Sequence, residues 1–168
     1  MMKKTIVDVF DRDEDAMEAV KRLLEGGVAK EHIHALSRGE DSPEKSFEIE
    51  KENESILFWG KQGALWGGLF GLLAGGIFSI VPGFGPLVAA GPVVSSLAGF
   101  LGGAATFGSA SALAAWLADF SMEELEAHRY EKLLKEGKAL VIVHAAGDEL
   151  KRAEDILEKM GKGELKIH

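Results

Sequence analysis

Short segments of alternating apolar and polar residues lie near the N-terminal end of the chain. They are residues 5–10 (TIVDVF) and 32–37 (HIHALS), and their alternation and β-branched residues predict two strands. Between them, apolar residues recur at helical spacing at Ala16, Val20 and Leu23, and Gly26 follows, so one amphipathic helix is expected there. The N-terminal part therefore predicts a β-α-β unit.

The C-terminal part repeats this order of elements. Residues 139–145 (ALVIVHA) are apolar at nearly every position, which is typical of a central strand covered on both faces. A helix starting at Asp148 and ending at Gly161 follows, and then a short strand at 164–167. An additional helix is expected over 122–136, and it or a second subunit would cover the open face of the sheet.

Two β-α-β units packed side by side predict an α+β fold, a ferredoxin-like split βαβ…βαβ domain with both crossover helices on one face of the sheet. Residues 1–50 and 121–168 would be the two halves of this domain. Residues 51–61 are interpreted as an acidic linker, and residues 62–120 as an insertion between the halves.

The insertion contains no Lys, Arg, Asp or Glu from residue 62 to residue 118. Proline and glycine are dense in its middle, which predicts a turn. A Gly-rich apolar helical hairpin is therefore expected, with arms over 62–81 and 94–118. Small residues at fourfold spacing would form one helix-packing stripe. The expected stripe comprises Gly63, Gly67, Gly71, Gly75, Ser95, Gly99 and Gly103, and the expected turn contains Pro82, Gly83, Gly85 and Pro86.

Each arm is long enough to cross a bilayer, which requires about 20 apolar residues. A hairpin would also bring Trp59 and Trp66 close to Trp116 and Phe120, as an aromatic belt at one membrane interface. Against insertion, the many Gly, Ala and Ser residues make both arms only moderately hydrophobic. A homo-oligomer that buries the hairpins in a shared core outside the membrane is therefore the alternative.

The charge balance and the cysteine content limit the possible partners. The chain has 19 basic and 27 acidic residues, a net charge of −8, which argues against nucleic acid as a partner. It contains no cysteine, which fits a reducing compartment. The apolar run at the N-terminus is interrupted by Asp8, so no signal peptide is expected. Both ends are therefore expected in the cytoplasm, with the hairpin in the cytoplasmic membrane or, in the alternative, a wholly cytoplasmic protein.

Candidate chemistry is sparse. His32 and His34 have the spacing of two ligands on one strand face, but a structural zinc site usually needs four ligands, so the pair is a weak metal candidate. Gly83-Phe84-Gly85 lacks the lysine of a phosphate loop, and no serine lies in a nucleophile motif. We expect no catalytic residue, no cofactor and no small-molecule substrate, and hence a protein that is not an enzyme.

Four segments carry a resemblance to a known family: TIVDVFDRDEDAMEAVKRLLEGGV, ALWGGLFGLLAGG, PGFGPLVAAGPVVSSLAGFLGGAA and RYEKLLKEGKALVIVHA. The chain resembles the bacterial general stress and heat-induced stress proteins and related glycine-zipper membrane proteins of unknown function. The resemblance implies a role in stress responses and no established enzymatic activity.

These expectations combine into three functional hypotheses. The first is a membrane-associated stress-response protein that self-assembles through the glycine-zipper hairpin, with itself and the lipid bilayer as partners. The second is a soluble homo-oligomeric binding or storage module. The third is a pore-forming oligomer, which ranks lowest because the second arm offers few polar residues for a lumen, namely Thr106, Ser109 and Ser111.

Overall fold

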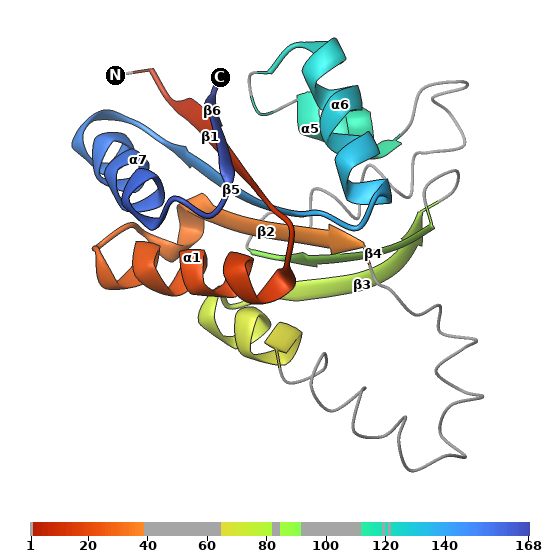
Figure 1. The fold of residues 1–168 in the computed structure, drawn as a ribbon, viewed down its shortest axis with the longest axis horizontal. Coiled ribbons are helices and arrows are strands. Elements are labelled where there is room, and N and C mark those ends of the chain that lie inside the picture. Colours follow the sequence, from red (N-terminus) through yellow and green to blue (C-terminus); the bar gives the residue numbers. More distant parts are fainter. Residues whose placement is uncertain (1, 39–64, 82–84, 92–111, 119, 121) are drawn as a thin grey trace.

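The described strands form one antiparallel sheet. The computed structural model describes residues 2–38, 65–81, 85–91, 112–118, 120 and 122–168. Six strands lie in the order β3-β4-β2-β5-β1-β6 (Figure 1). The strands are β1 Lys4–Phe10, β2 Ile33–Arg38, β3 Gly76–Val81, β4 Gly85–Ala90, β5 Ala139–Ala145 and β6 Glu164–Ile167. The labelled helices are α1 Asp13–Glu25, η1 Lys30–His32, α5 Ala112–Ala118, α6 Glu124–Lys135 and α7 Gly147–Met160, and residues 65–72 are also helical.

The two ends of the chain meet in the middle of this sheet. Strand β5 pairs with β1 on one side and with β2 on the other, and β6 pairs with β1. The prediction that residues 139–145 form a central strand is confirmed. Its apolar side chains alternate between the two faces, so that Val141 and Val143 lie in one hydrophobic cluster and Leu140 and Ile142 in the other. The α+β class and the elements predicted at both ends are also confirmed.

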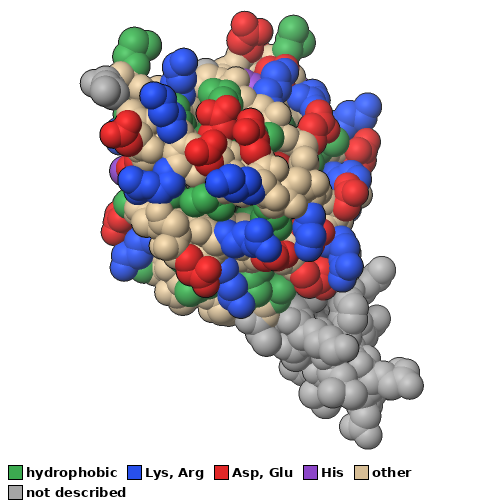
Figure 2. Space-filling model, turned by 60° about the vertical axis from the view of Figure 1, so that its left-hand side comes forward, with side chains coloured by type: hydrophobic (Ala, Val, Ile, Leu, Met, Phe, Trp, Pro, Cys, Tyr) green, Lys and Arg blue, Asp and Glu red, His purple; other side chains and the backbone are tan. Residues whose placement is uncertain are grey.

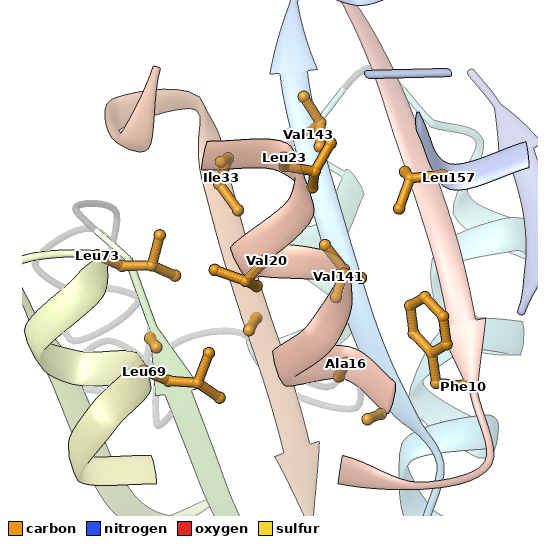
Figure 3. Close-up of a cluster of buried hydrophobic side chains, with 14 of the residues drawn as sticks. Phe10, Ala16, Val20, Leu23, Ile33, Leu69, Leu73, Val141, Val143 and Leu157 are labelled. Carbon is orange, nitrogen blue, oxygen red and sulfur yellow. The ribbon is translucent and has the colours of Figure 1, made fainter. Parts of the chain in front are cut away.

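Helices α1 and α7 cover the first face of the sheet, together with the helical residues 65–72 (Figure 1). Figure 3 shows Leu69 and Leu73 pointing from this helical segment toward α1, where Val20 lies. Both leucines are fully or almost fully buried. Part of the uncharged insertion is therefore built into the core of the domain and contributes apolar surface that the two ends do not supply.

Helices α5 and α6 cover the second face. Tyr130 and Leu134 of α6, with Trp116 and Leu117 of α5, pack with strand residues that include Leu140. The prediction that helix 122–136 covers the open face is confirmed, and α5, from the end of the insertion, extends the cover. Each face of the sheet is thus covered by one helix or more from the ends and one helical segment from the insertion.

The first arm of the predicted helical hairpin is helical over residues 65–72, as expected, but the prediction is wrong over residues 76–81. Helical residues end near Leu72, and residues 76–81 are strand β3. The end is a Schellman motif, in which the N–H of Gly75 donates to the carbonyl oxygen of Phe70 at 2.9 Å and that of Ala74 to Gly71 at 3.4 Å. The residues that follow, 76–81, include β-branched side chains, which favour a strand. A partner is available for this strand, since β4 pairs with the edge of β2 and β3 pairs with β4.

The expected turn residues divide between two positions. The chain does reverse between Val81 and Gly85, which are paired in the register of β3 and β4. However, Gly85 and Pro86 belong to β4 instead of the turn, and Pro82 and Gly83 lie outside the described residues. Most of the second arm, over 92–111, also lies outside them, as does the linker at 51–61; residues 112–118 are helical as expected.

The predicted aromatic belt is also wrong. Trp66 packs in the cluster on the first face, whereas Trp116 and Phe120 pack in the cluster on the second face, so the sheet separates them. These three side chains are buried because they fill the two cores of the domain, and Trp59 lies outside the described residues. No helix among the described residues is both long and apolar enough to cross a bilayer.

Candidate functional sites

The structure describes only part of the predicted glycine stripe. Gly67 and Gly71 lie on the helical segment 65–72, both exposed, and a methyl group added at either would meet no heavy atom within 4 Å. Gly75 follows the helix, and a methyl group there would lie 3.5 Å from the carbonyl oxygen of Gly91. Gly63, Ser95, Gly99 and Gly103 lie outside the described residues. The face at Gly67 and Gly71 thus has no packing partner in the described part of the chain, and self-association through it remains a prediction.

A buried hydrogen-bond network fixes this segment to the domain. The indole N–H of Trp66 donates to Asp13 Oδ2 at 3.3 Å, and the hydroxyl of Ser37 donates to Asp13 Oδ1 at 2.8 Å. Burial raises the pKa of Asp13, and these two hydrogen bonds oppose that effect. Since Asp13 begins α1 and Ser37 lies on β2, the network joins three elements and turns the opposite, glycine-bearing face outward.

The two candidate metal ligands do not share a strand face. His32 lies in the 3-10 turn η1, where its Nδ1 is 2.9 Å from Glu149 Oε1, an oxygen that also accepts the N–H of Ala29 at 2.8 Å. His34 is inside β2, only 4% exposed, with its ring centroid 5.5 Å from that of Phe120. The spacing argument fails because the strand begins at Ile33. Among the residues with described positions, no three potential ligands form a group that could hold a metal ion.

Phe120 is the centre of a cluster that the sequence did not indicate. Its ring centroid lies 4.9 Å from that of Trp116 and 5.8 Å from that of His144. Thr5 Oγ1 donates to the carbonyl oxygen of Phe120 at 2.5 Å and lies 2.9 Å from His144 Nδ1. A hydroxyl has one proton, so His144 Nδ1 must be the donor in the second bond, and Nε2 is the unprotonated nitrogen. The cluster fastens the segment between α5 and α6 to β1 and β5.

This hydroxyl–imidazole pair is not arranged for nucleophilic catalysis. Thr5 is completely buried, and its proton is used by a backbone carbonyl group. A catalytic pair requires the base to accept the hydroxyl proton, whereas here the imidazole donates its own. Burial lowers the pKa of His144, and neighbouring Lys3 and His32 add to this effect, so the ring is neutral at pH 7.

His34 is held as a neutral ring in the same region. Burial lowers its pKa to about 3, and the nearby His144 and His32 contribute. A methyl group added to Gly91 would lie 2.7 Å from His34 Nδ1, and that nitrogen has no hydrogen-bond partner among the described residues. Gly91 also has φ +132°, a conformation that side chains disfavour. The backbone at Gly91 therefore packs directly on the imidazole, which acts as a packing element between β2 and the end of β4.

A buried carboxyl group lies on the opposite face of the sheet. Asp8, in β1, is 1% exposed, and in the described part of the chain its Oδ1 has no hydrogen-bond partner. Burial raises its pKa to about 6, a change only partly offset by a hydrogen bond from the Val9 backbone. A methyl group at Gly163 would lie 2.1 Å from Oδ1, so the loop before β6 closes over the carboxyl group. Along β1, Asp8 shares a face with the buried Ile6 and Phe10, and the loop at Gly163 completes the burial of its carboxyl group.

The surface shows no concentration of one charge in the view of Figure 2, where Lys and Arg side chains alternate with Asp and Glu. Ion pairs among the described residues include Arg129 with Glu164 at 2.6 Å. Comparisons with protein-family models, with curated proteins and with solved structures found no match. Functional inference therefore depends on the residues of this chain alone.

Proposed function

We propose that this protein is a non-enzymatic stress-response protein that self-assembles, at a membrane, through its uncharged segment. The observation that carries the proposal is the outward face of the helical residues 65–72. Gly67 and Gly71 are bare there, and Leu72 beside them is 37% exposed although it is apolar. Small residues on a helix allow a second helix to approach closely, and the nearby leucine supplies apolar contact.

Rigid attachment of this face supports an assembly role. The opposite side of the segment is anchored by Leu69 and Leu73 in the core and by the bond of Trp66 to Asp13. A preorganised surface loses less conformational entropy on binding than a flexible one. The segment also carries no charge, so it is the part of an acidic chain where two copies approach with least repulsion.

A ferredoxin-like origin for the domain is part of the proposal. Its support is the order β2-β5-β1-β6 for the four strands of the two ends, with α1 and α7 on the same face. In this interpretation the insertion adds the β3-β4 hairpin at the edge of β2. The non-enzymatic assignment is supported by the Thr5–His144 pair. Its hydroxyl proton is donated to a backbone carbonyl group and not to the imidazole, so the pair serves packing and not nucleophilic catalysis.

Membrane association is supported by composition. Residues 92–111, outside the described part, are a further 20 uncharged positions, about the length that crosses a bilayer. The competing arrangement is a soluble oligomer that buries the same residues between subunits. The stress role comes from the family resemblance alone.

The test is measurement of particle mass with and without detergent, with separation of membrane and soluble fractions. We expect recovery in the membrane fraction after a carbonate and high-salt wash and an oligomer in detergent. Discrete oligomers without detergent would favour the soluble module, and conductance of reconstituted liposomes would favour the pore. A monodisperse monomer in both conditions would refute self-assembly.

A paired substitution tests the face itself. Replacing Gly67 and Gly71 with leucine should reduce self-association at least tenfold while leaving the domain folded, because a side chain added at either position starts in space that no described residue fills. Lys151→Leu, at an exposed position of α7, is the matched control for added surface hydrophobicity. Unchanged oligomer mass in the double variant would contradict the role of this face.

A further inference from the structure

Strand β3 is an edge strand whose hydrogen-bonding pattern can be assigned. The N–H of Gly91 donates to the carbonyl oxygen of Gly75 at 3.0 Å, in continuation of the β3-β4 register, which pairs Gly76 with Ala90. Hydrogen-bonded and non-hydrogen-bonded pairs alternate along an antiparallel ladder. The residues of β3 that bond to β4 are therefore Ile77, Ser79 and Val81.

The other three residues of β3 direct their backbone groups away from β4. These are Gly76, Phe78 and Ile80. Pro86, which lacks an N–H, lies opposite Ile80 in a non-hydrogen-bonded pair. The missing N–H therefore removes no hydrogen bond from the β3-β4 ladder. Among the described strands β3 pairs only with β4, so this row of donors and acceptors has no partner strand there.

The two edges of the sheet differ in a way that points to β3 as a pairing edge. Strand β6 has four residues, and two of them, Glu164 and Lys166, carry charges held in ion pairs with α6. Short length and charge are the usual protection of an edge against pairing. Strand β3 has six residues and contains neither a charge nor a proline.

The outward groups of β3 are complementary to themselves. Consider two β3 strands from two copies, paired antiparallel about a two-fold axis at Phe78. Phe78 of one copy would then lie opposite Phe78 of the other. Gly76 would face Ile80 of the other copy, and each of these pairs would exchange two hydrogen bonds. Two copies of a chain with a net charge of −8 repel each other, and an uncharged edge within the uncharged segment is where that repulsion is weakest.

We infer that the partner of β3 is β3 of a second copy, which joins two six-stranded sheets into one continuous sheet across a two-fold axis at Phe78. The inference rests on the proposed self-assembly and names one of its contacts.

Cysteine trapping in the full-length protein tests the inference, since the natural chain contains no cysteine. Residues in a hydrogen-bonded antiparallel pair have Cα atoms about 5.5 Å apart, within the range of a disulfide or a short cross-linker. Phe78→Cys should therefore give a covalent dimer under mild oxidation, and the yield should fall on dilution. Leu125→Cys, at an 81% exposed position on α6, is the control and should give at least tenfold less.

A second variant tests the backbone contribution. Ile80→Pro removes an outward N–H and leaves the inner ladder, so dimerisation should weaken at least tenfold while the unfolding transition of the monomer remains cooperative. Particle mass separates the two proposals. Oligomers that Phe78→Cys does not trap would refute pairing through β3 and leave self-assembly in place, whereas a monomeric natural chain would refute both.

Discussion

Replacing Asp8 with asparagine removes an ionisable group that β1 buries almost completely. The carboxyl group is 1% exposed, and burial raises its pKa from 3.8 to about 6. Of the residues that the structure describes, none supplies a compensating cation: Lys162, in the adjacent loop, pairs with Glu18 at 3.1 Å and with Asp15 at 3.6 Å. Asparagine has nearly the same shape and no charge, so the substitution isolates the cost of the buried charge.

The magnitude follows from the change in pKa. A difference of about two pH units between the folded and unfolded states corresponds to about 3 kcal/mol. Between about pH 4 and pH 6 the folded state holds a proton that the unfolded state has released. The contribution of Asp8 to stability is therefore fully present below pH 4, falls by about 1.4 kcal/mol per pH unit, and is lost above pH 6. Asp8→Asn should then be more stable than the natural chain by about 1–3 kcal/mol at pH 7.5, with little gain at pH 4.

The assay is urea denaturation of both proteins at pH 4, 5, 6 and 7.5, at one protein concentration because assembly affects apparent stability. The quantity to examine is the difference between the two unfolding free energies, because other carboxylates titrate in both proteins. Asp155→Asn, at an exposed position of α7, is the control and should show a difference near zero. A difference that does not change from pH 4 to pH 7.5 would refute the argument.

Substitutions at three further positions test local features by the same measurement. Thr5→Val should lower the free energy of unfolding by about 1–3 kcal/mol, because His144 Nδ1 loses its buried partner, and Thr5→Ser should restore most of it. Gly91→Ala should cost more than about 2 kcal/mol, since its methyl group would lie 2.7 Å from His34 Nδ1 on backbone at φ +132°. Ala74→Gly should add about 1 kcal/mol, because Ala74 has φ +57° in the Schellman motif; a loss would indicate that this motif is absent.

The elements at the two ends could be predicted because their signals are local. Apolar periodicity identified α1, α7 and β5, and the apolar run at 139–145 indicated burial on both faces before any partner strand was known. The cover of the second face by α6 followed from the need to bury that face. Each of these inferences depends on a few neighbouring residues and on the general rule that apolar faces are covered.

The insertion could not be predicted in this way. Glycine at every fourth position is compatible with a helix, but it also weakens that helix, and residues 76–81 are rich in β-branched side chains. What decides between the two structures is the unpaired edge of β2, to which β4 adds in antiparallel register. This contact joins residues about 50 positions apart, so no window of the sequence contains it.

The buried polar groups escaped prediction for a related reason. Asp8 shares its strand face with Ile6 and Phe10, but a carboxyl group is normally exposed to solvent, and its burial depends on the loop at Gly163, which closes over it. Thr5 and His144 lie 139 positions apart in the chain and meet because β1 pairs with β5. Such groups become visible only when the strand order is known.

The same uncharged segment contributes to the core and to the proposed assembly surface, so the choice of substitution decides what an experiment reports. Leu69 and Leu73 are buried beneath the segment, and truncating either would destabilise the domain by about 2–5 kcal/mol and alter assembly indirectly. On the outward side of the same helix, a methyl group added at Gly67 or Gly71 would meet no heavy atom of the described residues within 4 Å. Only substitutions at the outward positions separate the two roles, because they change the surface presented to another copy without opening a cavity behind it.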